Sequence, residues 1–261
     1  MKQADLLIEI HTGELPPKQL LTLANAFLQN IIHGLTQLQL HFKDAKHFAT
    51  PRRLAVLIET VAELQKEQEI IKRGPALAAA FNEAGEPTPA TLGFLRSLNI
   101  NRDQLITIEQ AEGAWIGFKE TRPGKNITTL LPELVASTLK TLPSSKRMRF
   151  GEANAEFVRP IHSIILLYGT DIIPAIIMGI ATDRKTRGHR FHAPDWIDIP
   201  SASLYEATLQ EAHVVADFYK RKSLVLEKAM AALSPQQKES AELLISSDDF
   251  VNEITGLVEW P

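Results

Sequence analysis

Residues 186–192 read TRGHRFH and combine the residue types that bind phosphate and stack on nucleotide bases. Arg187 and Arg190 carry planar guanidinium groups, which can each donate two hydrogen bonds to one phosphate. Phe191 offers a stacking face, and Gly188 lets the backbone come close to a ligand. The segment predicts a phosphate-binding loop, although one short run of this kind is weak support by itself.

Most of the arginines in the chain lie in similar short clusters. The others are PRR at 51–53, KRGP at 72–75, KRMR at 146–149 and VRPIH at 158–162. Such clusters can hold a nucleic-acid backbone, or they can form internal ion pairs with some of the 31 acidic residues. We favour the first use, because ion-pair networks do not need Gly-Pro and Arg-Pro neighbours. The residues that we expect to contact a phosphate backbone and its bases are Arg52, Arg53, Arg147, Arg149, Arg159, Arg187, His189, Arg190 and Phe191.

The histidines His189 and His192 have H-x-x-H spacing, which could hold zinc together with Asp183 or Asp195. Such a site would point to a metal-dependent hydrolase. The arginines in and beside the pair would repel a divalent cation, and histidines in a basic loop more often donate to phosphate or pack on neighbouring rings. We therefore predict no metal site.

The run EIHTGELPP at residues 9–17 holds Glu9, His11 and Glu14, which could form an acid–base cluster. Capping explains the run better, because Thr12 and Glu14 precede a helix that begins at the double proline, where a carboxylate suits the helix dipole. The sequence has no Walker loop, dinucleotide-binding glycine fingerprint or nucleophile elbow. We predict no catalytic residue in this chain.

The bulk composition is that of a soluble globular protein. The 261 residues carry a net charge of −3, so a polyanion site must be a local basic patch on a mildly acidic protein. The absence of cysteine removes disulfides, thiolate metal sites and thiol catalysis, and it fits a reducing compartment. No apolar run reaches the roughly 20 residues that span a bilayer. We expect a cytoplasmic protein that does not bind membranes.

Strands and helices of mixed order are expected to position the candidate residues. Apolar runs bounded by turn residues predict strands at 5–10, 48–61, 161–168, 172–180 and 196–199, and a hairpin of 104–109 with 115–120. Helical spacing predicts helices at 16–38, 75–81, 89–98 and 126–142, with a mostly helical region from 201 onward. Arg52 and Arg53 fall at the start of the 48–61 strand, and 161–168 should pair antiparallel with 172–180.

The element order predicts an α+β fold with a mixed or antiparallel sheet and packed helices. We expect one α+β domain made of residues 1–66 and 144–200, an inserted α/β module at 67–143, and a mainly helical segment at 201–261. The chain ends in an apolar run, Leu257 to Pro261, which is unusual for a natural terminus. We expect the chain to be part of a longer protein.

Seven motifs, in order along nearly the whole chain, resemble those of one family, the β subunit of bacterial heterotetrameric glycyl-tRNA synthetase. They lie at residues 9–17, 48–56, 72–75, 146–149, 157–162, 186–192 and 253–261. His11 departs from the family pattern, in which a small residue is more usual at this position. Seven motifs in register make the resemblance specific.

The resemblance implies an α2β2 glycine–tRNA ligase of the cytoplasm in which the α subunit carries the class II aminoacylation core, with its ATP and Mg. The β subunit is required for activity and binds tRNA, so this chain would be a noncatalytic part without a cofactor of its own. The family's N-terminal region is similar to the editing-type domain of the phenylalanyl-tRNA synthetase β subunit. Beyond this region the family continues into an HD-type domain, helical regions and an anticodon-binding domain.

On this reading, the arginine clusters converge on one face that binds the acceptor region of glycine tRNA. Two alternatives remain open. One is a scaffold whose arginines pair internally and which docks the α subunit or the rest of β. The other is an editing-type or metal-dependent hydrolase that uses His189 and His192.

Overall fold

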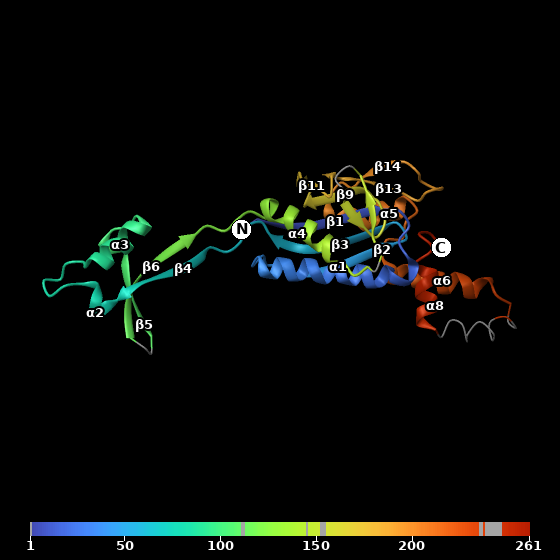
Figure 1. The fold of residues 1–261 in the computed structure, drawn as a ribbon. Coiled ribbons are helices and arrows are strands. Elements are labelled where there is room, and N and C mark those ends of the chain that lie inside the picture. Colours follow the sequence, from blue (N-terminus) through green and yellow to red (C-terminus); the bar gives the residue numbers. More distant parts are fainter. Residues whose placement is uncertain (1, 111–112, 145, 152–154, 235–236, 238–246) are drawn as a thin grey trace. The chain divides into compact units, whose positions relative to one another are not determined.

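A computed structural model of the chain describes residues 2–110, 113–144, 146–151, 155–234, 237 and 247–261 (Figure 1). The chain divides into two compact units. The main unit comprises residues 1–64 and 125–261, and the smaller unit comprises residues 65–124. The smaller unit is shorter than the module expected at 67–143, because the helix at 127–141 packs into the core of the main unit.

A seven-stranded sheet forms the centre of the main unit. Its path runs through β11 (Ile176–Ile177), β12 (Ile180–Asp183), β9 (Ile161–Tyr168), β1 (Gln3–Thr12), β3 (Arg53–Ala62) and β2 (Asp44–Thr50), with β10 (Asp171–Ile172) beside β9. All neighbours are antiparallel except β12 and β9, which are parallel. The predicted α+β class with a mixed sheet is confirmed.

Two helices cover one face of this sheet. Helix α1 (Pro17–Gln37) begins at a proline, as predicted, and buries one apolar stripe along its length. Helix α4 (Ile127–Thr141) is capped by the Asn126 side chain, which accepts a hydrogen bond from the Thr128 amide at 2.9 Å. Both helices pack on the strand residues that alternate toward them, which include Leu6, Ile8 and Ile10 of β1.

The other face of the sheet has an apolar half and a polar half. Leu7 of β1 packs there with Ile165 and Leu167 of β9, under Tyr205 and Leu209 of α5 (Tyr205–Glu211). Further along the same face of β1, the alternation that buries Leu7 also buries Glu9 and His11. Next to this polar half lie β13 (Lys185–Arg187) and its antiparallel partner β14 (Trp196–Asp198).

Two strand predictions were wrong in connectivity. The segment predicted as one strand at 48–61 is a hairpin, because Pro51 and Arg52 form a turn between β2 and β3. The antiparallel pairing predicted for 161–168 with 172–180 is confirmed only at its start, where β10 pairs with β9. The second strand is broken after Ile172, at Pro174, and again at Met178 and Gly179, both of which have positive φ. After that turn, β12 runs parallel to β9 instead of antiparallel.

The smaller unit is a three-stranded antiparallel sheet with two short helices. Its order is β4 (Gln68–Ala76), β6 (Gly113–Arg122) and β5 (Leu105–Gln110), accompanied by α2 (Leu77–Ala80) and α3 (Pro89–Leu98). The predicted hairpin of β5 and β6 is confirmed, whereas β4 was missed. In the KRGP motif, the Arg73 guanidinium stacks on the Trp115 ring at 3.7 Å.

Helices α6 (Phe218–Ala232) and α8 (Asp248–Thr255) follow, in agreement with the predicted helical segment. A fully buried arginine ties both to the sheet. Arg221 of α6 donates hydrogen bonds to the carbonyl oxygens of Ala49, Val215 and Thr255 at 2.6, 2.6 and 3.2 Å. In the described part of the chain, no helix has the length and apolar character needed to cross a membrane.

Candidate functional site

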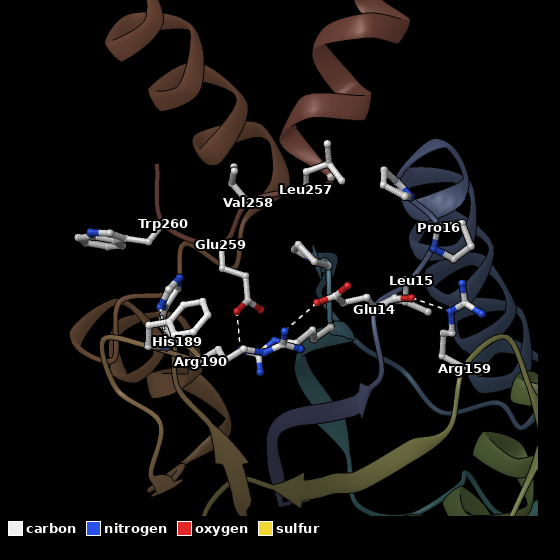
Figure 2. A pocket seen from close by; sticks show the side chains of 15 residues that line it. Glu14, Leu15, Pro16, Arg159, His189, Arg190, Leu257, Val258, Glu259 and Trp260 are labelled. Carbon is white, nitrogen blue, oxygen red and sulfur yellow. Dashed lines mark hydrogen bonds and ion pairs between the residues drawn. The ribbon is translucent and has the colours of Figure 1, made fainter.

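Five of the seven sequence motifs meet at one pocket of about 420 Å³ in the main unit (Figure 2). Its lining comes from residues 14–17, 51–52, 159, 189–191 and 256–260. These segments are far apart in the sequence, and the sheet brings them together. The convergence makes this pocket the candidate site.

Backbone hydrogen bonds hold three turns together beneath the pocket. The Leu15 amide donates to the Pro51 carbonyl at 2.7 Å, and the Thr12 amide donates to the Arg52 carbonyl at 2.7 Å. The Gly13 amide donates to the Pro160 carbonyl at 3.0 Å. Because these hydrogen bonds join backbone atoms only, the turns keep their relative positions whichever side chains they carry.

A buried carboxylate, Glu259, joins the C-terminal segment to the arginine turn. It accepts hydrogen bonds from Thr50 at 2.8 Å and from Arg52 at 2.6 Å. Burial alone would raise the pKa of Glu259, but the guanidinium groups of Arg53 and Arg52 outweigh it and lower the pKa to about 2. Glu259 is therefore charged at neutral pH, and it neutralises arginines that the sequence had assigned to phosphate.

Arg53 does not reach the surface at all, because its side chain is 0% exposed. Its Nε atom lies 3.7 Å from Glu9, its Nη1 atom lies 3.4 Å from Glu259, and its Nη2 atom donates to the Arg187 carbonyl at 2.7 Å. Burial alone would lower the pKa of Arg53, but Glu259 and Glu9 outweigh it and raise the pKa. The prediction that Arg53 contacts phosphate is wrong, because two internal carboxylates hold it inside the protein.

Glu9, in the run that the sequence assigned to helix capping, links β1 to β13 and α5. Its carboxylate accepts hydrogen bonds from the hydroxyl groups of Thr186 in β13 and Tyr205 in α5. Burial and the nearby Glu9 charge raise the pKa of Tyr205 well above its usual value, so the phenol keeps its proton and donates it. The loop that follows β13 is thus attached to the sheet by side chains as well as by its backbone.

Glu14 lies between two arginines at the centre of the pocket (Figure 2). Its carboxylate pairs with Arg190 Nη1 at 3.0 Å, and its backbone carbonyl accepts a hydrogen bond from Arg159 Nε at 2.8 Å. The predicted capping role is wrong, because Pro16 precedes α1 and no side chain caps this helix. The Thr12 hydroxyl donates to the Gly13 carbonyl instead.

The loop after β13 presents Arg190 and Phe191 to solvent, and 80% of the Phe191 surface is exposed. His189 Nδ1 accepts hydrogen bonds from the amides of Phe191 and His192, both at 3.2 Å, and so keeps the loop compact. Gly188 is buried, and its carbonyl accepts a hydrogen bond from Arg52 at 3.1 Å. The expected close approach at Gly188 is therefore to the protein's own chain.

Replacing Gly188 with alanine should destabilise this loop. An added Cβ would lie 2.5 Å from the Ala193 carbonyl oxygen and 2.9 Å from the Ala193 Cβ, so the backbone must shift. Overpacking of this kind costs about 1–3 kcal/mol. Urea unfolding should show the loss. Gly93→Ala is the comparison: an added Cβ there meets nothing within 4 Å, and because Gly93 lies inside helix α3, this change should leave stability unchanged or raise it by up to about 1 kcal/mol. Wild-type stability of Gly188→Ala would mean that the loop adapts freely.

The remaining predicted arginines lie outside the pocket lining. Arg147 donates hydrogen bonds to the carbonyls of Lys140 and Leu142 at the end of α4, where a cation suits the helix C-terminus. Arg149 pairs with Glu156 at 3.0 Å across the hairpin of β7 (Met148–Phe150) and β8 (Ala155–Phe157).

Arg187 stacks on the Trp196 ring at 4.2 Å and donates a hydrogen bond to the Pro194 carbonyl. The predicted set is therefore divided. The pocket gathers Arg52, Arg159, His189, Arg190 and Phe191, and the other four residues do not line it.

The histidine pair considered for zinc is arranged by ring stacking. The His189 and His192 rings stack with their centroids 4.5 Å apart, and His189 Nδ1 is already an acceptor within the loop. In the part of the chain that the structure describes, no group of three or more His, Cys, Asp or Glu side chains could hold a metal ion.

Sequence reasoning missed Glu259, Thr50 and Trp260 as parts of the site, and it misread Glu9. Glu259 lies more than 200 residues from Arg52 and Arg53, so periodicity could not pair them. One signal was present, because Glu259 and Trp260 stand in one of the seven motifs. Motif membership indicated that these residues matter, but it did not indicate their partners.

Comparison with known proteins agrees with the motifs. The family model described as glycyl-tRNA synthetase beta subunit matches residues 6–261. The chain is 44% identical to the glycine–tRNA ligase beta subunit of Marinobacter nauticus and 41% identical to those of Chromohalobacter salexigens and Hahella chejuensis. Each match covers the whole chain, which spans 37% of the length of each relative. The chain belongs to the glycyl-tRNA synthetase beta subunit family.

Proposed function

We propose that this chain is the N-terminal region of the β subunit of a glycine–tRNA ligase and that its pocket face binds the acceptor region of tRNA. The α subunit of an α2β2 enzyme would carry the aminoacylation site with ATP and Mg, and this region would support it without a catalytic residue of its own. A likeness to the editing-type domain of the phenylalanyl-tRNA synthetase β subunit is part of the same proposal.

The single observation that carries the proposal is the convergence of the family's motifs on one pocket that presents arginines and exposed aromatic rings. Arg190 and Phe191 are exposed at its rim, and Arg159 approaches from the opposite side. Arginines hold phosphate oxygens, while aromatic rings stack on bases that are not paired. A net charge of −3 favours a local basic site over general attraction to polyanions.

A second candidate function is a docking scaffold for the α subunit. One observation favours it: each of the seven predicted arginines has a partner inside the protein, as described above for each. Arginines used in this way stabilise a surface without touching RNA. If the chain is a docking scaffold, it should bind the α subunit and should not bind tRNA.

Charge reversal at Arg190 should weaken binding to glycine tRNA about tenfold or more, because a charge-assisted hydrogen bond contributes about 1.5–3 kcal/mol. It should also lower the slope of log affinity against log salt by about one, as one phosphate contact is lost. Fluorescence anisotropy at several salt concentrations measures both quantities for the wild type and Arg190→Glu.

The control is Lys43→Glu, which reverses an exposed lysine paired with Glu59 at the far end of β3. Because it changes the net charge equally, it separates a contact from a general charge effect. The tRNA-binding proposal fails if Arg190→Glu and Lys43→Glu behave alike. Binding of the α subunit alone, with no affinity for tRNA, would favour the scaffold.

A further inference from the structure

Five aromatic rings form a continuous array, and three of them, Phe191, His189 and Trp260, line the pocket. Successive centroids lie 6.1 Å apart for Phe191 and His189, 4.5 Å for His189 and His192, 5.5 Å for His192 and His213, and 5.1 Å for His213 and Trp260. Burial lowers the pKa of His189, which favours a neutral ring that can stack. The rings support one another, so the array is a preformed surface.

Both ends of the array open into the pocket. Phe191 and Trp260 line it and are 80% and 37% exposed, although large aromatic rings are usually well buried. His189, His192 and His213 lie between these two rings and connect them. An exposed aromatic ring held by a stack behind it loses little conformational freedom when a flat ligand packs on it.

A place for an anion lies next to the rings. The Glu14 carboxylate occupies it, paired with Arg190, and both side chains are more than half exposed at 64% and 53%. An exposed ion pair of this kind contributes little, so another anion can replace the carboxylate at small cost. Arg159, whose Nε atom is bound to the Glu14 carbonyl, lies on the other side of Glu14 (Figure 2).

We infer that the pocket holds one unpaired nucleotide of an RNA strand, whose base packs on Phe191 and whose phosphate takes the place of the Glu14 carboxylate on Arg190. The inference rests on the proposed function and narrows its ligand from the acceptor region of tRNA to one unpaired nucleotide of a single-stranded segment. Base faces inside an A-form helix are covered by their neighbours, so an exposed ring array serves only bases that are unstacked. The volume of about 420 Å³ falls within the range of roughly 300–1,000 Å³ for pockets that enclose small ligands.

Three labelled RNA hairpins test this inference. One has a blunt stem, the second carries a single-stranded 3′ extension, and the third carries the same extension without bases. The third probe has the phosphates of the second, so any difference between them reports base stacking. The wild-type chain should bind the extended hairpin about tenfold more tightly than the abasic one, the range expected for a base stacked on an aromatic ring.

Two variants separate the base from the phosphate. Phe191→Ala should lower the affinity for the extended hairpin to that for the abasic one and leave the abasic hairpin unaffected, while Tyr219→Ala, which removes an exposed ring of α6, should change neither. Glu14→Gln should strengthen binding of both extended probes, because Arg190 is released from its internal partner. Its control is Glu59→Gln, which removes one exposed carboxylate at the far end of β3.

The outcomes distinguish this inference from the proposed function. Equal and tight binding of all three hairpins would overturn the unpaired-nucleotide site and leave RNA binding intact. An unchanged extended-to-abasic ratio in Phe191→Ala would also overturn it. If no hairpin binds even at low salt, while Phe191→Ala weakens binding to the α subunit, both proposals fail and the array is a protein interface.

Discussion

Replacing Arg53 with methionine should lower the free energy of unfolding of the main unit by about 3–5 kcal/mol, the usual cost of removing one partner from a buried ion pair. The change leaves Glu9 and Glu259 buried without their shared cation, and the Arg187 carbonyl loses a hydrogen bond. Urea unfolding can follow the main unit through Trp196 and Trp260.

The matched control for this prediction is Arg190→Met. Arg190 is exposed and pairs with the exposed carboxylate of Glu14, so its loss should change stability by no more than about 0.5 kcal/mol. A different pattern would refute the assignment. If Arg53→Met keeps wild-type stability but loses affinity for tRNA, Arg53 is a ligand contact and its buried position is not the functional one.

Acidification below pH 6.5 should destabilise the folded chain strongly, with His11 as a main cause. Only 4% of His11 is exposed, and burial together with Arg53 and Arg52 lowers its pKa to about 3. Among the described residues, neither of its ring nitrogens has a hydrogen-bond partner. Folding therefore requires His11 to stay neutral.

The direction of this effect follows from proton binding. Between pH 6.5 and about 3 the unfolded chain protonates His11 and the folded chain does not, so the unfolded state gains about 1.4 kcal/mol for each pH unit of acidification. Over the whole interval the loss is about 5 kcal/mol, comparable with the total stability of a marginal domain. Glu259 adds a loss at lower pH, between 4.5 and about 2, because its pKa is lowered on folding.

His11→Phe isolates the histidine contribution because it keeps a ring and removes the titrating group. Stability is measured by urea unfolding at several pH values. Between pH 6.5 and 4.5 the wild type should lose about 1.4 kcal/mol per pH unit more than the variant, because only the wild type has the titrating ring. His33→Phe, at an exposed position of α1, should follow the wild-type curve. Parallel curves for the wild type and His11→Phe would show that His11 is hydrated or charged in the folded protein.

Local sequence signals were sufficient for the elements that depend on neighbours along the chain. The double proline and the apolar spacing that follows it located α1, and the β-branched run of β9 located a central strand. The hairpin of β2 and β3 was read as one strand, because its two-residue turn at Pro51 and Arg52 lies between two apolar stretches. A turn that short hardly interrupts an apolar pattern.

The same limit applies to the candidate site. Three of the five arginine clusters, at 51–53, 158–162 and 186–192, belong to segments that meet at the pocket, but the sequence could not tell which arginines are already neutralised. The charge of Arg53 is balanced by Glu9 and Glu259, which lie near it only because the fold brings β1, β3 and the C-terminal segment together. Arg190 also has a carboxylate partner from another segment, because the fold places Glu14 beside it. Motifs located the site, and long-range contacts decided the role of each residue.

The buried network gives the pocket a defined shape. Glu259 holds Arg52, Arg52 holds the Gly188 carbonyl, and the loop that follows carries Arg190 and Phe191. These links connect the C-terminal segment to the exposed loop through two hydrogen bonds. In our account the buried arginines position the surface and the exposed residues meet the ligand, so changes at Arg53 and at Arg190 should affect different measurements.

The salt titration of the wild-type chain decides whether this chain binds tRNA. The folded chain is titrated with labelled glycine tRNA and with a noncognate tRNA, and anisotropy is recorded at several salt concentrations. We expect binding that weakens steeply as salt rises, because phosphate contacts release counterions. Absence of binding to either tRNA at the lowest salt would contradict the account and assign the pocket to contacts with protein.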